Sequence, residues 1–258
     1  MKILVTGGNG YIAKAIAKVL SKKYEIRTIT RQDFDLTNYS ATNDYFDNKH
    51  FDVVIHTAVA GGSRLVVDGS DVLDKNLQMY YNLLSQKNHY DRLIHFGSGA
   101  EIAAPWEPYG LSKRVIANSM RGKAGHYNLR IFAVFDENEL DTRFIKGNLL
   151  RYINHEPMVV YQNKYMDFFY MEDLIALVDY YIKTENPPQE VDCRYNYSLT
   201  LLEIASYINT LDDHKVQIET LNKGIADPYV GNHLPVLSSF VGLADGIHKV
   251  FEKLKINH

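Results

Sequence analysis

The feature that most limits the fold is a glycine-rich turn between an aliphatic segment and a helical one. Residues Lys2–Thr6 form a short aliphatic run, glycines follow, and apolar residues then recur at helical spacing up to Ser21. Across this junction Gly7, Gly10 and Ala13 stand at the spacing G-x-x-G-x-x-A. Because glycine adopts backbone conformations closed to other residues, the segment predicts a strand, a tight turn and a helix.

The alternation of strand and helix continues through the first half of the chain. Aliphatic strands that alternate with helices are typical of a parallel sheet covered by helices on both faces. We therefore predict an α/β fold with a doubly wound parallel sheet of the Rossmann type. Its further strands are expected at Glu25–Thr30, Asp52–His56, Leu93–Phe96 and His126–Val134, and its helices at Ser40–Lys49, Val72–Gln86 and Pro108–Met120.

The pattern becomes less regular after Val134, which predicts a second, smaller part of the chain. Residues 1–134 are expected to form the Rossmann domain, and residues 135–258 a small mixed α/β C-terminal substrate cap. A strand and a helix near residues 165–184 are expected to return to the first domain. The cap is expected to contain helices at Thr142–Asn154, Met171–Lys183 and Leu201–Leu211 and short strands near Met158 and Phe168.

The glycine turn is suited to binding a dinucleotide cofactor. A Cβ atom at Gly10 would block the approach of a pyrophosphate, and the helix that follows presents N–H groups and a positive dipole to an anion. We therefore predict cofactor contacts from the residues of this turn, namely Gly7, Asn9, Gly10, Tyr11 and Ile12. A structural turn that binds no ligand is the alternative interpretation.

The end of the second strand indicates which nicotinamide cofactor is preferred. In this position an acidic residue would accept a hydrogen bond from the adenosine ribose of NAD, whereas Arg31 can bind the 2′-phosphate of NADP. The sequence therefore favours NADP, with NAD as the alternative. Asp35 and Leu36 are placed to flank the adenine, although Asp35 is also suited to cap the helix that begins near Thr37.

Three residues form a candidate catalytic group. Tyr109 and Lys113 stand four residues apart in YGLSK, so a helix places both side chains on one face. An ammonium beside a phenol stabilises the phenolate, which suits Tyr109 to exchange a proton with a carbonyl or alcohol. Ser98 follows a strand, at the sheet edge where open α/β folds bind ligands, and its hydroxyl is placed to bind the same oxygen.

Composition and charge exclude several other kinds of site and partner. The chain has 28 Lys plus Arg and 31 Asp plus Glu residues, and it has no basic stripe for a nucleic acid. Its ten His residues never fall at the spacing H-x-x-x-H, and the lone Cys193 forms no internal disulfide, which predicts no metal site and a reducing compartment. Apolar runs are too short for a signal peptide or a membrane span. We expect a cytoplasmic protein without a membrane partner.

Together these motifs resemble the extended short-chain dehydrogenase/reductase family, also called the NAD-dependent epimerase/dehydratase family. The resemblance implies that Ser98, Tyr109 and Lys113 are catalytic and that Asn76 supports the cofactor site, to which Thr57 and Ala58 also belong. It further implies a nucleotide-sugar substrate and a homodimer formed through the helices near residues 72–86 and 109–120. The segments that carry it are TGGNGYIA, TRQDFDLTN, HTAVAGG, KNLQMYYNLL, HFGSGAE, EPYGLSK, LRIFAVF, MDFFYMEDL and YNYSLTLLEIA.

Within this family the pattern looks most like GDP-fucose synthase and related keto-sugar reductases, but it departs from them in places. The Cys and His that invert sugar carbons in that branch correspond to Ala100 and Arg143 here, and neither can exchange protons in that way. Ser98 and Tyr109 are only eleven positions apart, which shortens the loop that normally faces the sugar. The usual Asn after the sixth strand is replaced by Ala133. A smaller or unusual substrate is compatible with these changes.

The leading hypothesis is an NADP-dependent reductase that reduces a keto group on a nucleotide-diphosphate sugar. Arg143, at the start of the cap helix, is the candidate ligand of the substrate diphosphate, and an ordinary surface arginine is the alternative. An NAD-dependent sugar-nucleotide epimerase is the second hypothesis. A non-catalytic regulatory protein that binds NADP is the third. Glu101, near Ser98, leaves a dehydratase as a minor alternative.

Overall fold

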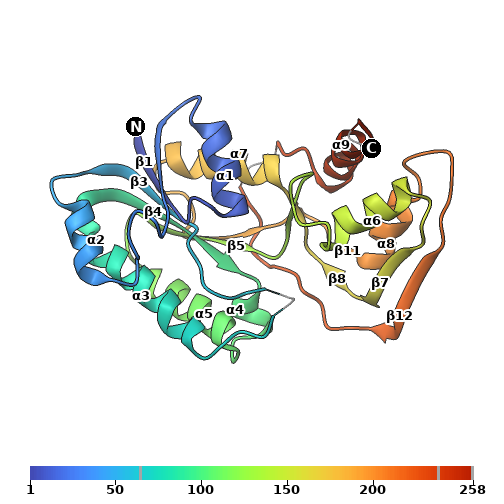
Figure 1. Ribbon diagram of the computed structural model, residues 1–258, viewed down its shortest axis with the longest axis horizontal. Coiled ribbons are helices and arrows are strands. Elements are labelled where there is room, and N and C mark those ends of the chain that lie inside the picture. The colour runs from blue at the N-terminus through green and yellow to red at the C-terminus, as the bar shows by residue number, and fades with distance from the viewer. Residues whose placement is uncertain (64–65, 237–238, 257–258) are drawn as a thin grey trace. The chain divides into compact units, whose positions relative to one another are not determined.

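The computed structural model describes residues 1–63, 66–236 and 239–256 (Figure 1). The chain divides into two compact units, the first made of Met1–Arg130 and Val178–Val191 and the second of Ile131–Leu177 and Asp192–His258. The first unit therefore ends slightly before the expected boundary at Val134. The segment that returns to it is Val178–Val191, which shares residues 178–184 with the expected range 165–184. The strand that returns to the sheet follows the helix in the chain.

A six-stranded sheet forms the centre of the first unit. Its strand order is β10-β5-β4-β3-β1-β2, and the pairs β2–β1, β1–β3 and β3–β4 are parallel. The predicted α/β fold of the Rossmann type is thereby confirmed. The strands are β1 (Lys2–Thr6), β2 (Glu25–Ile29), β3 (Phe51–His56), β4 (Tyr90–Ser98), β5 (His126–Ile131) and β10 (Glu190–Cys193).

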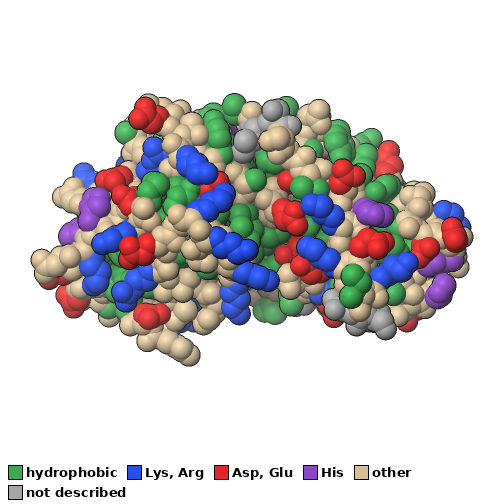
Figure 2. All heavy atoms as spheres, turned by 90° about the horizontal axis from the view of Figure 1, so that it is seen from above, with side chains coloured by type: hydrophobic (Ala, Val, Ile, Leu, Met, Phe, Trp, Pro, Cys, Tyr) green, Lys and Arg blue, Asp and Glu red, His purple; other side chains and the backbone are tan. Residues whose placement is uncertain are grey.

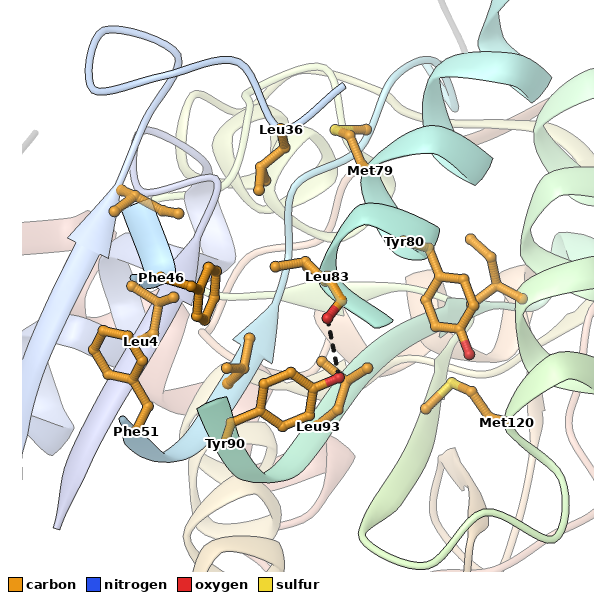
Figure 3. Close-up of a cluster of buried hydrophobic side chains, with 13 residues drawn as sticks. Leu4, Leu36, Phe46, Phe51, Met79, Tyr80, Leu83, Tyr90, Leu93 and Met120 are labelled. Carbon is orange, nitrogen blue, oxygen red and sulfur yellow. Dashed lines mark hydrogen bonds between the residues drawn. The ribbon is translucent and has the colours of Figure 1, made fainter. Parts of the chain in front are cut away.

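Helices cover both faces of this sheet. The helices α2, α3 and α5 lie on one face, and α1 and the C-terminal part of α7 lie on the other (Figure 1). A buried cluster fills the space on the α3 side, with Leu4 and Leu93 from the sheet facing Met79 and Leu83 from α3 (Figure 3). The helices of this unit are α1 (Tyr11–Leu20), α2 (Tyr39–Phe46), α3 (Asp71–Ser85), α4 (Ala100–Ala103), α5 (Pro108–Met120), the 3₁₀ turn η1 (Lys87–His89) and the end of α7 (Met171–Lys183).

The strand order changes direction between β1 and β3. The chain leaves β1 for β2 on one side and later enters β3 on the other, so the loops that follow β1 and β3 diverge at the same edge of the sheet. Ligands of open α/β sheets bind in the crevice at such a switch point. The glycine turn follows β1, and Thr57 and Ala58 follow β3, so the topology brings these two predicted cofactor segments together.

The second unit is mixed α/β, as the sequence predicted. The pairs β7–β12 and β6–β9 are parallel, and β8–β11 is antiparallel. Sequence analysis did not identify β12 or α9, and its last Rossmann strand was too long, because β5 ends where the chain passes into the second unit. The elements are β6 (Val134–Phe135), α6 (Phe144–Ile153), β7 (Met158–Asn163), β8 (Tyr165–Met166), β9 (Phe169–Tyr170), the start of α7, β11 (Leu199–Thr200), α8 (Leu201–Ile208), β12 (Ile218–Ile225) and α9 (Leu243–Ile256).

Buried aspartates hold the irregular segments of the second unit. Asp173 accepts hydrogen bonds from the backbone N–H groups of Val241 and Gly242 at 2.7 and 3.0 Å and from the hydroxyl of Tyr195 at 2.5 Å. Asp192, on β10, likewise accepts a hydrogen bond from the backbone N–H of Asn232 at 2.6 Å. Since a buried carboxylate is stable only with such donors, these bonds fix loops that have no regular structure.

Charged side chains of both signs lie on one face of the molecule. On the face drawn in Figure 2, Lys and Arg side chains lie among Asp and Glu side chains. Among the described residues, we find no helix whose length and apolar character would let it cross a membrane.

Candidate active site at the carboxyl edge of the sheet

The glycine turn after β1 has the geometry that a diphosphate needs. Gly7 has φ +69°, and a Cβ atom there would lie 2.8 Å from the backbone of Ala58, so only glycine fits between the two loops. Gly10 is the N-cap of α1, and within the described chain no side chain caps that helix or places an acid in its first turn. Asn9 is exposed on the turn, and Tyr11 begins the helix. The N-terminus of α1 therefore fits the pyrophosphate of a dinucleotide.

The loop after β3 is fixed to β1 and to α3. Ala58 donates its N–H to the hydroxyl of Thr6 at 3.2 Å, and Thr57 donates its hydroxyl to the carbonyl oxygen of Thr6 at 2.7 Å. The buried amide of Asn76 binds both the N–H and the C=O of Ala60, at 2.8 and 3.0 Å. Asn76 thus holds the loop in place. Its predicted part in cofactor binding is consistent with support of this loop.

Asn76 also links this loop to the helix that carries Tyr109. Its amide nitrogen donates to the hydroxyl of Ser112 at 3.0 Å, and Ser112 in turn donates to the carbonyl oxygen of Tyr109 at 2.7 Å. Ser112 is fully buried on α5. The position of the first turn of α5 is therefore tied to the loop that the topology places at the switch point.

The end of β2 presents Arg31 to solvent. The turn beside it is closed by Asp33, whose carboxylate accepts from the N–H and the hydroxyl of Thr30 at 2.8 and 3.0 Å. Asp35 accepts from the N–H and hydroxyl of Thr37, both at 2.9 Å, and the backbone bond lowers the pKa of Asp35 below its usual value. Both acids therefore serve local turns, and Arg31 is an exposed cation that follows β2.

The side chain of Leu36 belongs to the hydrophobic core of the first unit. Its side chain is only 7% exposed and belongs to the buried cluster with Met79 and Leu83 (Figure 3). Burial of a leucine side chain stabilises a fold by roughly 1.5–3 kcal/mol. The side chain therefore contributes to the core, and the predicted contact between Leu36 and the adenine stays a prediction.

The structure brings the predicted catalytic residues of α5 to the end of β4. The Nζ atom of Lys113 donates to the carbonyl oxygen of Phe96 at 2.6 Å, two residues before Ser98 on the same strand. The same Nζ atom lies 5.9 Å from the centre of the Tyr109 ring. Ser98 is the last residue of β4, and its Oγ atom accepts from the N–H of Ala100 at 3.2 Å. Lys113 is therefore the common neighbour of Tyr109 and of the strand end that carries Ser98.

Burial lowers the pKa of Lys113. Its side chain is enclosed between α5 and the sheet, and this desolvation lowers its pKa from 10.5 to about 8, while the nearby Glu101 carboxylate opposes the shift. At neutral pH the ammonium form still predominates. A phenol, an ammonium and a hydroxyl grouped in this way can pass a proton to a carbonyl oxygen and stabilise the charge that results.

Sequence analysis missed the contacts that hold Tyr109. Gly62 has φ +74°, and a Cβ atom there would lie 2.7 Å from the Tyr109 ring, so the backbone of this loop packs directly on the phenol. Asp68 fixes the loop by accepting the N–H of Gly62 at 2.9 Å. The pair Gly61-Gly62 was the available signal, since two successive glycines favour a backbone with positive φ.

Arg143 does not belong to the same unit as these residues. It is the exposed N-cap of α6 in the second unit. Nearby Glu139 is buried, which raises its pKa to about 8, and the Arg143 charge acts in the opposite direction. The role of Arg143 toward a substrate therefore stays a prediction.

Comparison with known proteins agrees with the fold. CDP-abequose synthase of Yersinia pseudotuberculosis is 21% identical over 246 residues, which cover 84% of this chain and 87% of that protein. The structure of GDP-mannoheptose C4 reductase from Campylobacter jejuni with NADP bound superposes with a TM-score of 0.79 at 16% identity and 98% coverage of both chains. The UDP-glucuronic acid 4-epimerase of Bacillus cereus, in complex with NAD, gives 0.75 at 19% identity and full coverage of both chains.

A family model decides the assignment. The NAD dependent epimerase/dehydratase family matches residues 3–196, a range that contains the glycine turn, Ser98, Tyr109 and Lys113. The resemblance predicted from the sequence is confirmed, and the chain belongs to the NAD dependent epimerase/dehydratase family.

Proposed function

We propose that this protein is an NADP-dependent reductase that acts on a keto group of a nucleotide-diphosphate sugar. The observation that carries the proposal is the position of Lys113, whose Nζ atom lies 2.6 Å from the carbonyl oxygen of Phe96 at the end of β4 and 5.9 Å from the Tyr109 ring. In the same unit, the N-terminus of α1, whose N-cap is Gly10, and the exposed Arg31 suit a phosphorylated dinucleotide. The names of the relatives, which include a CDP-abequose synthase and a GDP-mannoheptose reductase, support a nucleotide-sugar substrate.

Each residue of the group has a defined part in the proposed reaction. NADPH, when bound, supplies the hydride that reduces the carbonyl carbon. Tyr109 gives its phenolic proton to the carbonyl oxygen, and the Ser98 hydroxyl donates a hydrogen bond to the same oxygen. The ammonium of Lys113 stabilises the phenolate that remains on Tyr109. The cofactor is held by Gly7, Asn9, Gly10, Tyr11 and Ile12 at the glycine turn and by Thr57 and Ala58 after β3.

The proposed activity is tested by incubating the purified protein with NADPH and a panel of 4-keto sugar nucleotides. Consumption of NADPH with formation of the alcohol is expected for at least one member. If tightly bound NAD copurifies and sugars interconvert without net change in cofactor absorbance, the protein is an epimerase. If calorimetry detects cofactor binding while no sugar nucleotide reacts, the regulatory hypothesis replaces the reductase.

Arg31 is expected to set the preference between the two cofactors. Replacing it with alanine removes a charged contact to the 2′-phosphate worth about 1.5–3 kcal/mol, so KM for NADPH should rise roughly 10- to 100-fold. KM for NADH should stay unchanged, since NADH has no such phosphate. Steady-state kinetics with both cofactors checks this, and Lys18→Ala, an exposed cation on the far end of α1, is the matched control. Equal losses with NADPH and NADH would contradict the assignment.

A homodimer is proposed through α3 and α5. These two helices lie side by side on one face of the first unit (Figure 1), and Tyr81 on α3 is 45% exposed there. Sedimentation velocity tests the assembly, and a monomer at micromolar concentration would contradict it. We further propose a cytoplasmic location, because the chain has a single cysteine, Cys193, and it is buried.

A further inference from the structure

Glu101 is a buried carboxylate beside Ser98 that the proposed reaction does not use. It lies on α4, three residues after Ser98, and its side chain is 3% exposed. Its Oε1 atom accepts the N–H of Ser98 at 2.9 Å, and its Oε2 atom accepts from the Nε atom of Arg130 at 2.9 Å. The amide of Asn128 lies 3.3 and 3.5 Å from the two oxygens. A carboxylate engaged on both oxygens is not poised to act as the acid of a dehydratase.

We propose that Glu101 is a positioning residue, which is held by a buried ion pair with Arg130. Its carboxylate fixes the backbone of Ser98 and favours the ammonium form of Lys113. This inference rests on the proposed function. Ser98 and Tyr109 are separated by only eleven positions, and α4 occupies that connection. Within this short connection, the carboxylate of Glu101 reaches the backbone of Ser98.

The ion pair with Arg130 is part of a row of alternating charges. Arg130 lies 3.4 Å from Glu190 on β10, and Glu190 in turn binds Arg121 at 2.8 Å. Arg130 is 5% exposed, whereas Arg121 is 63% exposed, so the row runs from the strand end at Ser98 to the surface. A buried ion pair needs such additional partners, because each charge loses its hydration. The row joins β4, α4, β5 and β10 around the carboxylate.

Two glycines show how closely α4 and its carboxylate are packed. A Cβ atom at Gly97 would lie 2.2 Å from Oε1 of Glu101 and 2.5 Å from Oδ1 of Asn128. A Cβ atom at Gly110 would lie 2.0 Å from the carbonyl oxygen of Ala104, where α4 meets α5. Gly97 precedes Ser98 and Gly110 follows Tyr109. The carboxylate and the short helix are therefore in contact with the immediate neighbours of both proposed catalytic residues.

Glu101 and Lys113 bind the backbone of β4 two residues apart, because Glu101 accepts the N–H of Ser98 and Lys113 donates to the carbonyl oxygen of Phe96. Burial raises the pKa of Glu101, and Arg130 and the Ser98 N–H oppose this by stabilising the carboxylate. The ionised carboxylate in turn favours the ammonium form of Lys113. If Glu101 becomes neutral, Lys113 should lose its proton at a lower pH. A purely structural carboxylate would have no such effect on the pH profile.

The kinetic test compares Glu101→Gln with Glu101→Asp on the substrate identified in the panel. Glu101→Gln removes the charge, so we expect kcat to fall on the order of 10- to 100-fold and the alkaline limb of the pH profile to move to lower pH, with KM for NADPH unchanged. Glu101→Asp keeps the charge but shortens its reach, so kcat should fall without movement of the limb. Glu107→Gln, an exposed glutamate on the same connection, is the matched control and should behave as wild type. Loss of thermal stability in Glu101→Gln with wild-type kcat and pH limb would overturn the proposal.

A second measurement does not depend on activity. In ¹⁵N-labelled protein, the amide proton of Ser98 should resonate downfield, because it is bonded to a carboxylate, and should move upfield in Glu101→Gln but not in Glu107→Gln. An unchanged Ser98 resonance in Glu101→Gln would overturn the proposal. If Glu101→Gln does not fold, a shift of this resonance in Glu101→Asp decides in the same way. If the wild type reduces no sugar nucleotide, the proposed function fails, while the Ser98 resonance still decides whether Glu101 positions this strand end.

Discussion

Replacement of Tyr109 with phenylalanine is expected to lower kcat for keto-sugar reduction by about 10²- to 10⁴-fold, which is the range that a positioned proton donor contributes. The variant keeps the ring that packs against Gly62 and loses only the hydroxyl. Affinity for NADPH should therefore change little. Single-turnover kinetics under saturating NADPH separates the loss of proton transfer from any change in binding.

The control for this substitution is Tyr161→Phe. Tyr161 lies on β7 and is 71% exposed, so the same loss of a hydroxyl there should leave kcat unchanged. If Tyr109→Phe retained wild-type kcat, proton donation would have to come from another group. The role of Tyr109 as the acid would then be rejected, even if the protein reduced a sugar nucleotide.

Replacement of Lys113 with methionine is expected to stabilise the apo protein at pH 7 while it abolishes activity. Burial lowers the pKa of Lys113 from 10.5 to about 8, so the buried charge costs roughly 3 kcal/mol below pH 8. Methionine removes this cost, although loss of the hydrogen bond to the Phe96 carbonyl oxygen takes back about 1 kcal/mol. The free energy of unfolding at pH 7 should therefore rise by about 2 kcal/mol, as measured by urea denaturation.

The pH dependence gives this prediction a definite sign. Between about pH 8 and pH 10.5 unfolded Lys113 binds a proton that the folded form has lost, so wild-type stability should increase with pH across this window. Below pH 8 both forms carry the proton and the full cost remains. The advantage of Lys113→Met should consequently shrink between pH 8 and pH 10.5. Exposed Lys22→Met is the control and should show no such dependence; an advantage that is constant with pH would show that burial does not penalise the Lys113 charge.

The gain in stability and the loss of activity that we expect for Lys113→Met have the same cause. The ammonium of Lys113 is buried at a position where an apolar side chain would give a more stable fold. This position places the charge beside Tyr109. Strain of this kind is expected at a functional site. The adjacent Glu101 reduces the cost, since its carboxylate favours the charged form of Lys113.

Local spacing was sufficient for the motifs of the first unit. The glycine turn predicted a strand, a turn and a helix, and β1 and α1 follow it closely because Gly7 must adopt positive φ where the two loops meet. The four-residue interval from Tyr109 to Lys113 predicted a shared helical face, and α5 provides it. These predictions depend on backbone geometry within one or two turns, so no distant contact was needed to make them.

Contacts between distant parts of the chain could not be predicted in this way. The burial of Leu36, for example, depends on Met79 and Leu83 of α3, whose side chains belong to the same buried cluster. The strand β10 is too short to have a periodic pattern of its own and joins the sheet only by pairing with β5. The pairing of β10 with β5 also places Glu190 beside Arg130.

The sequence by itself determined the Rossmann-type sheet and the family, and it predicted the Ser98, Tyr109 and Lys113 group, because each depends on residue types at short, fixed intervals. Only the tertiary structure decided that Lys113 is buried at the end of β4 and that Glu101 is paired with Arg130. Such pairing depends on how strands and helices pack across the sheet, and the charge of a buried group depends on neighbours that the order of residues along the chain does not reveal.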